Sequence, residues 1–438
     1  MPLTNKTALF TVWSASHGNS RTGQDRAMNI DQLPAFLKPF FRPFRNSLTQ
    51  AQFAHLWALI LALVINFRTS KLVHLARMLP SSTHRTRHGA FLAISDFDAS
   101  VLLKDAAARL LKRLNPRPGE RLDLILDDHR IAKRGRKMDR LSKIWDHKRQ
   151  KFVHGHIVLF AAICFRGVVM PIRLHLQKPK GQPGPRYRKL TDLAAEMIRQ
   201  FDAPAGLKVH VLFDAFYLCP QVVKACENRG FVWFSVAAKN RNFRREAEKG
   251  KGRKIADLAP GLLKHHGRFV HMKRSRGTAK LKIAHIDGHL SRIGRVRMVL
   301  SKRPHETWKT TIAIVTNATG TDARGIVAIY ERRWNIEVLF KDLEQSLGLG
   351  EYQMLHERAI VNHLHLVCLA HLLLTHHAMD CAGEKAITSN MEVRLPSVEQ
   401  RIATLRQAAR DEQISRFFRN GGLHERYRRR LDTILQVA

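Results

Sequence analysis

Acidic residues at the ends of two apolar runs, and one acidic residue in a later amphipathic segment, are the side chains best suited to chemistry. Asp127 and Asp128 end one run, Asp214 ends another, and Glu337 lies much further along. Carboxylates that meet at one point repel each other unless a divalent cation neutralises them, and oxygen ligands suit Mg²⁺. These residues therefore predict a metal-dependent site. For any one of them alone, a turn former or helix cap is the alternative.

An alternation of strand-like and helical segments shows how these residues could meet. The predicted order is strand, strand, strand, helix, strand, helix, strand, at 121–128, 152–164, 167–176, 187–202, 208–214, 220–228 and 231–236. This order is typical of a mixed α/β sheet, which holds ligands at the carboxyl ends of its strands. If the first and fourth strands are neighbours, their aspartates lie at the same edge.

A further strand at 311–316 leads into a predicted long helix from Thr321 to about Leu347. At about 100° per residue, its polar side chains form one stripe along the margin of the apolar face. The stripe comprises Tyr330, Arg333, Glu337, Lys341 and Glu344. A merely solvated stripe would lie opposite the apolar face, so this position indicates contact with a ligand. Charge pairs that only stabilise the helix are the alternative.

The charge of the chain predicts a polyanionic partner. Lys and Arg number 75 against 36 Asp and Glu, a net charge of +39, while 45% of the 438 residues are hydrophobic. That hydrophobic content indicates a folded protein, so nucleic acid is the expected partner. The stretch 130–151 is strongly basic, and its first cations could line a path for phosphates beside the first aspartates: Lys133, Arg134, Arg136 and Lys137. Simple solvation of these side chains is the alternative.

Three blocks, taken in order, resemble a known family. The run from Tyr330 to Glu337 is similar to the Y-(2)-R-(3)-E-(6)-K signature of bacterial insertion-sequence DDE transposases. Residues 126–135 and 211–217 look like the blocks that carry the family's first and second Asp, and the resemblance covers about 120–370. It implies a ribonuclease H-like mixed sheet flanked by helices, with a β-rich insertion between the second Asp and the Glu and an α-helical N-terminal domain.

The resemblance also implies roles for individual residues. Asp128, Asp214 and Glu337 would be catalytic and would hold Mg²⁺ or Mn²⁺, as two ions. Asp128 is preferred to Asp127 because it matches the family's Asp when the following block is aligned. Tyr330 and Arg333 would contact the DNA backbone near the cleaved strand.

Two positions depart from the family pattern. The signature Lys is Glu344 here, and the Thr or Ser usual after the first Asp is His129. A carboxylate at 344 would repel the scissile strand, so Lys341 is expected to supply the missing cation. The departures leave open a decayed, inactive transposase that acts only as a DNA-binding protein.

The predicted function is that of a transposase that cleaves insertion-sequence ends and joins them to target DNA. A nuclease of the same fold is a further alternative. The predicted partner is double-stranded DNA, both transposon ends and target, bound by a dimer. Five cysteines without a C-x-x-C pair indicate a reducing compartment, and the N-terminus shows no signal peptide. The apolar run 56–65 is too short to span a bilayer and predicts a buried helix, so we expect a bacterial cytoplasmic, nucleoid-associated protein without membrane contact.

Shifts in composition predict the domain organisation. Residues 1–30 are expected to be loose, 31–119 to form a helical DNA-binding domain with a helix-turn-helix-like stretch at 69–92, and 240–303 to form the insertion. The catalytic core would then comprise 120–239 and 304–380, followed by a basic helical region at 381–438.

Overall fold

The computed structural model describes residues 32–419, except 67–69, 80–83, 147–149, 183–185 and 275–276. The segment predicted to be loose, 1–30, and the end of the basic C-terminal region lie outside the described residues. Part of the turn in the helix-turn-helix-like stretch also lies outside them.

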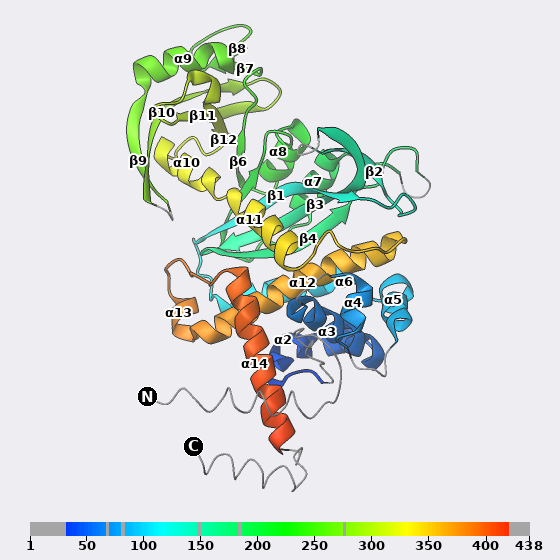
Figure 1. Ribbon diagram of the computed structural model, residues 1–438. Helices are drawn as coiled ribbons and strands as arrows, with labels where there is room; N and C mark the ends of the chain where they lie inside the picture. The colour runs from blue at the N-terminus through cyan, green and yellow to red at the C-terminus, as the bar shows by residue number, and fades with distance from the viewer. Residues whose placement is uncertain are drawn as a thin grey trace.

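A mixed sheet forms the centre of the chain (Figure 1). Its core order is β4-β3-β1-β5-β6, in which β1 is antiparallel to β3 and parallel to β5, and β6 continues parallel to β5. These strands are β1 (Arg121–Lys133), β3 (Lys151–Phe165), β4 (Val168–Leu176), β5 (Lys208–Phe213) and β6 (Val232–Val236). Helices α7 (Leu190–Arg199) and α8 (Pro220–Glu227) connect the last three. The predicted ribonuclease H-like topology is confirmed, with one extra short strand, β2 (Ser142–Asp146), on the edge of β3.

The predicted β-rich insertion extends this same sheet. Its strands join the core through β12 (Ile312–Thr316), which pairs antiparallel with β6 on one side and with β11 on the other. The further strands are β7 (Asn242–Arg245), β8 (Arg253–Lys254), β9 (Arg268–Arg274), β10 (Gly277–Leu290) and β11 (Gly294–Lys302). The insertion also contains a helix that we did not predict, α9 (Ile255–His266). Its buried Leu258 and Leu262 have helical spacing, but Pro260 and Gly261 interrupt the pattern.

The predicted long helix is in fact broken, which corrects the sequence-based expectation. It consists of α10 (Ala323–Glu331), α11 (Trp334–Lys341) and a π-helical turn, η4 (Asp342–Ser346). At the break, the backbone N–H groups of Arg332 and Arg333 donate to carbonyls three residues earlier instead of four. Both arginines reach carboxylates of β1 from this point, Arg332 to Asp123 and Arg333 to Asp127.

Helices from both ends of the chain pack below the sheet in Figure 1. The N-terminal set is η1 (Ala35–Leu37), α2 (Lys38–Phe41), η2 (Arg42–Ser47), α3 (Gln50–Ile65), α4 (Leu72–Ala76), α5 (Arg85–Ile94) and α6 (Ala99–Arg113). The C-terminal set is α12 (Glu357–Ala382), α13 (Glu384–Thr388) and α14 (Val398–Arg419). The short helix η3 (Trp308–Thr310) belongs to neither set and lies just before β12. The apolar run 56–65 is buried within α3, as predicted.

Helix α12 contacts β4 of the sheet and also α3, α5 and α6. It is long and apolar enough to cross a membrane, but 89% of its most apolar stretch is buried inside the protein. This burial identifies α12 as the helix that holds the two layers together.

Candidate active site

The middle of β1 and the end of β5 bring the predicted aspartates together. The strand predicted to end at residue 128 in fact continues to Lys133, because its second half pairs with β3. The two strands run parallel, and Leu126 pairs with Phe213, so Asp127 and Asp214 both follow this pair at the same edge. Asp214 begins a tight turn in which its carboxylate accepts the backbone N–H of Phe216 at 3.0 Å. Helix α11 lies across β1 and supplies the remaining charged groups (Figure 1).

Arg333 links the strand to the helix. Its guanidinium donates to Asp127 Oδ2 at 2.7 Å and to Glu337 Oε1 at 3.2 Å. The side chains of Arg333 and Asp127 are 15% and 13% exposed, whereas that of Glu337 is 39% exposed. The site therefore consists of enclosed groups on the strand and a more accessible carboxylate on the helix.

Asp128 points to the other face of β1, because successive side chains of a strand alternate. Its Oδ1 accepts the hydroxyl of Tyr217 at 2.9 Å, and its Oδ2 lies 3.7 Å from Arg130 Nε. The preference for Asp128 is thus not supported by the ion pairs at this edge, in which Asp127 shares Arg333 with Glu337. Tyr217, fully buried, was not singled out from the sequence; its only signal was its place three residues after Asp214.

The electrostatics of the edge are those of crowded carboxylates. Burial, followed by repulsion from Asp214, raises the pKa of Asp127 to about 7, and the pairing with Arg333 opposes this shift. Burial likewise raises the pKa of Asp214, with Asp128 adding to the effect. A cation that entered here would relieve both the desolvation and the repulsion.

The donor chemistry of the edge suits a hard divalent cation, since Asp127, Asp214 and Glu337 offer only oxygen ligands. Within the described ranges, however, no three His, Cys, Asp or Glu side chains are close enough to form a metal cluster. Arg333 lies between Asp127 and Glu337 and takes up the charge of both. The carboxylates are chemically suited to the metal, and Arg333 would have to move away from Asp127 and Glu337 for a cation to bind them.

The predicted DNA contacts fall into different environments. Tyr330, whose pKa burial raises to about 12, lies beside Arg333 and Asp214. Lys341 is exposed near Asp342 and Glu399. The exposed part of the loop after β1 presents three further cations, Arg134, Arg136 and Lys137.

Lys133 was predicted to contact DNA phosphates, but its contacts lie within the protein. Its Nζ donates to the carbonyls of Gly350 and Tyr352 at 2.7 and 2.9 Å, and lies 3.1 Å from the centre of the Tyr352 ring. Burial lowers its pKa to about 7. Because strand alternation turns Lys133 toward the core, its ammonium group holds the segment after η4 and has no phosphate to face.

The two departures from the family pattern contact each other. His129 Nε2 lies 2.9 Å from Glu344 Oε1, so β1 and the π-helical turn η4 are joined by this pair. The His129 ring also packs against Phe340 of α11, with ring centres 4.7 Å apart. The contact between His129 and Glu344 was not predicted from the sequence. The only indication of it was that both positions depart from the family pattern in the same chain.

Comparison with known proteins agrees with this arrangement. Residues 118–373 match the family model described as the transposase DDE domain, which is more than half of the chain. The chain belongs to the DDE transposases. No curated protein matches the sequence. Membership makes this chain a DNA-binding transposase of the nucleotidyl-transfer type, in a family that normally uses divalent metals.

Proposed function

We propose that this transposase cleaves the ends of an insertion sequence and joins them to target DNA by divalent-metal-dependent phosphoryl transfer. The observation that carries the proposal is that Arg333 pairs with both Asp127 and Glu337, while Asp214 follows the strand that pairs with β1 beside Asp127. We assign these three carboxylates as the metal ligands. Asp127 replaces Asp128 in the set because it shares Arg333 with Glu337.

The carboxylates and Arg333 would have different roles in this reaction. Two bound Mg²⁺ or Mn²⁺ ions would activate a water or a DNA 3′-hydroxyl and stabilise the oxygen that leaves phosphorus. Asp127 and Asp214 supply buried negative charge for the cations, and Arg333, once released from Asp127, can form charge-assisted hydrogen bonds to the phosphate. Tyr217 donates its hydroxyl to Asp128 and so ties the middle of β1 to the turn after β5.

Nicking and joining are then the same displacement with different nucleophiles. One P–O bond forms as the opposite one breaks in line, so a single site can serve both steps. Tyr330 and Arg333 would contact the strand that is cut, and Arg134, Arg136 and Lys137 would follow its phosphates. The partners are transposon ends and target DNA, bound by a dimer.

Mg²⁺-dependent nicking and strand transfer on DNA that carries the element ends test the proposal. Asp127→Asn, Asp214→Asn and Glu337→Gln should each lose more than about 100-fold in rate, since residues that only orient a metal ligand already cost about 10–100-fold. Asp128→Asn is the matched variant and should retain at least about tenfold more activity than Asp127→Asn. The reverse order of these two variants would return the assignment to Asp128.

The alternatives give different results in the same assay. Metal-dependent nicking without any joined product would identify a nuclease of this fold. DNA binding without metal-dependent cleavage would identify a decayed transposase that only binds DNA. Either result overturns the proposed reaction.

A further inference from the structure

A short basic motif before α3 forms a ridge on the surface of the N-terminal helices. The sequence Lys38-Pro-Phe-Phe-Arg42-Pro-Phe-Arg45 repeats a cation, a proline and a phenylalanine, and no acidic residue occurs from Gln32 to Phe53. The phenylalanines face inward, with Phe40 and Phe44 at 3% and 1% exposure and their ring centres 5.7 Å apart. The core therefore anchors one side of α2 and η2, and the cations are held on the other.

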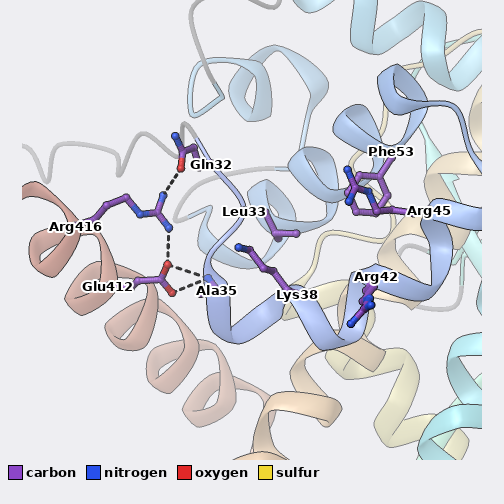
Figure 2. A pocket seen from close by; sticks show the side chains of 9 residues that line it. All are labelled: Gln32, Leu33, Ala35, Lys38, Arg42, Arg45, Phe53, Glu412 and Arg416. Atoms are coloured by element: carbon purple, nitrogen blue, oxygen red, sulfur yellow. Dashed lines mark hydrogen bonds and ion pairs between the residues drawn. The ribbon is translucent and has the colours of Figure 1, made fainter. Parts of the chain in front are cut away.

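The three cations of this ridge line one wall of an open groove of about 690 Å³ (Figure 2). Lys38, Arg42 and Arg45 are exposed, and the Arg45 guanidinium lies 5.4 Å from the centre of the Phe53 ring. Seven residues of helical backbone span roughly 10 Å. That length can follow about three phosphates of one DNA strand, which are spaced about 3.4 Å along the duplex axis.

Helix α14 forms the opposite wall with Glu412 and Arg416. Glu412 is the one acidic residue of the lining, and its carboxylate is already used: it accepts the backbone N–H of Ala35 at 2.8 Å and pairs with Arg416. Arg416 also donates to Gln32 at 3.1 Å. The groove therefore offers positive charge from a rigid frame.

The groove lies at the far end of α14 from the candidate active site. In Figure 1, α14 crosses α12 and runs down toward α2, while the sheet and α11 lie above α12. The first turn of α14 contacts η4, where Ser346 donates to Glu399, whereas Glu412 and Arg416 line the groove more than three helical turns further along. A DNA segment in the groove would thus lie apart from the strand that is cut at Asp127.

We propose that this groove binds the phosphate backbone of a stretch of duplex DNA distinct from the stretch that is cut. The inference rests on the proposed function, because it takes duplex DNA as the polyanion. Phosphate contacts of this kind position a duplex and carry no sequence information. The groove would hold the DNA on the enzyme independently of sequence, while the active site engages the scissile strand.

Salt-dependent binding of the full-length chain to random-sequence duplexes tests the groove. The triple variant Lys38→Gln, Arg42→Gln, Arg45→Gln should lower the slope of log affinity against log salt by about 2 to 3, at about 0.9 per phosphate contact. The matched control removes the same charge from exposed helical lysines elsewhere, Lys224→Gln, Lys264→Gln, Lys385→Gln, and should change the slope by less than about 0.5. Since the control matches the net charge, only local contacts distinguish the two variants.

A second variant guards against misfolding. Lys38→Glu with Arg42→Glu leaves Arg45 on Phe53 intact and should weaken binding further than neutral replacements at the same two positions, with an unchanged thermal unfolding temperature. Equal slopes for the groove and control triples would overturn the groove proposal while leaving the proposed function untouched. Wild-type protein without salt-dependent duplex binding would instead overturn the proposed function. Loss of binding to single-stranded RNA alone would show that the groove serves another polymer and would also overturn the proposal.

Discussion

Replacing Glu344 by lysine, the residue favoured by the family signature, is expected to impair this particular chain. Glu344 is 45% exposed and its partner His129 is 16% exposed, with 2.9 Å between Glu344 Oε1 and His129 Nε2. Exposed ion pairs contribute about 0.2–1 kcal/mol, and the enclosed His129 puts this pair near the upper end. A lysine at 344 would remove that attraction and add a cation beside the imidazole, for a total of about 1–2 kcal/mol.

The pair should influence the reaction through α11. His129 packs on Phe340, and Phe340 packs on Phe160 of β3 with ring centres 5.2 Å apart. Phe340 lies three residues after Glu337, so movement of η4 away from β1 would shift the helix that carries the candidate carboxylate. His129 and Glu344 are therefore positioning residues, and their loss should lower kcat more than it raises KM.

The experiment is a double-mutant cycle on strand cleavage. Glu344→Lys alone should lose roughly 5- to 30-fold in rate, which corresponds to 1–2 kcal/mol. His129→Thr together with Glu344→Lys should recover to within a few-fold of wild type, because the repulsion is gone. Gln345→Lys, which also places a lysine at an exposed position of the same turn, should have little effect.

The refuting result is specific. A coupling below about 0.3 kcal/mol between positions 129 and 344 would be within the range of independent sites. Full activity of Glu344→Lys alone would lead to the same conclusion. In either case the contact would have no part in holding α11, and the departures would be unrelated.

The remaining predictions concern stability and DNA contact. Arg166, 6% exposed and paired with Glu120, also donates to the carbonyls of Leu114 and Ser389 and so joins segments far apart in the sequence. Arg166→Ala should cost about 3–5 kcal/mol in urea denaturation, and a loss below about 1 kcal/mol would contradict this joining role. Between pH 7 and 10.5 the unfolded chain keeps the Lys133 proton that the folded chain has lost, so the free energy of unfolding should rise with pH by at most about 1.4 kcal/mol per unit. Lys133→Met should flatten this rise. Parallel plots of unfolding free energy against pH for the variant and the wild type would refute the prediction. Arg134→Ala should lower the salt slope of DNA binding by about 0.9 whereas Lys133→Met should not, and equal effects on the slope would restore Lys133 as a phosphate contact.

Local patterns in the sequence were sufficient for the order of strands and helices in the core. Short apolar runs predicted the strands, and one 3.6-residue pattern predicted α7, because such patterns depend on the backbone geometry within each segment. Asp127, Asp128 and Asp214 were expected at neighbouring strand ends; the parallel pairing of β1 with β5 agrees, but β1 continues past both aspartates to Lys133. The family signature then located Glu337 and Arg333.

Contacts between distant segments decided the rest. Which of Asp127 and Asp128 meets Glu337 depends on the face of β1 that α11 covers, and strand alternation leaves both faces open until the helix is packed. The same applies to Lys133, a loop-side cation in sequence that becomes enclosed because Gly350 and Tyr352 fold back over β1. The break at Arg333 likewise follows from its pairing with a strand some 200 residues earlier. Local periodicity in the sequence cannot predict these contacts, because the residues that make them are distant in sequence and come close only in the folded chain.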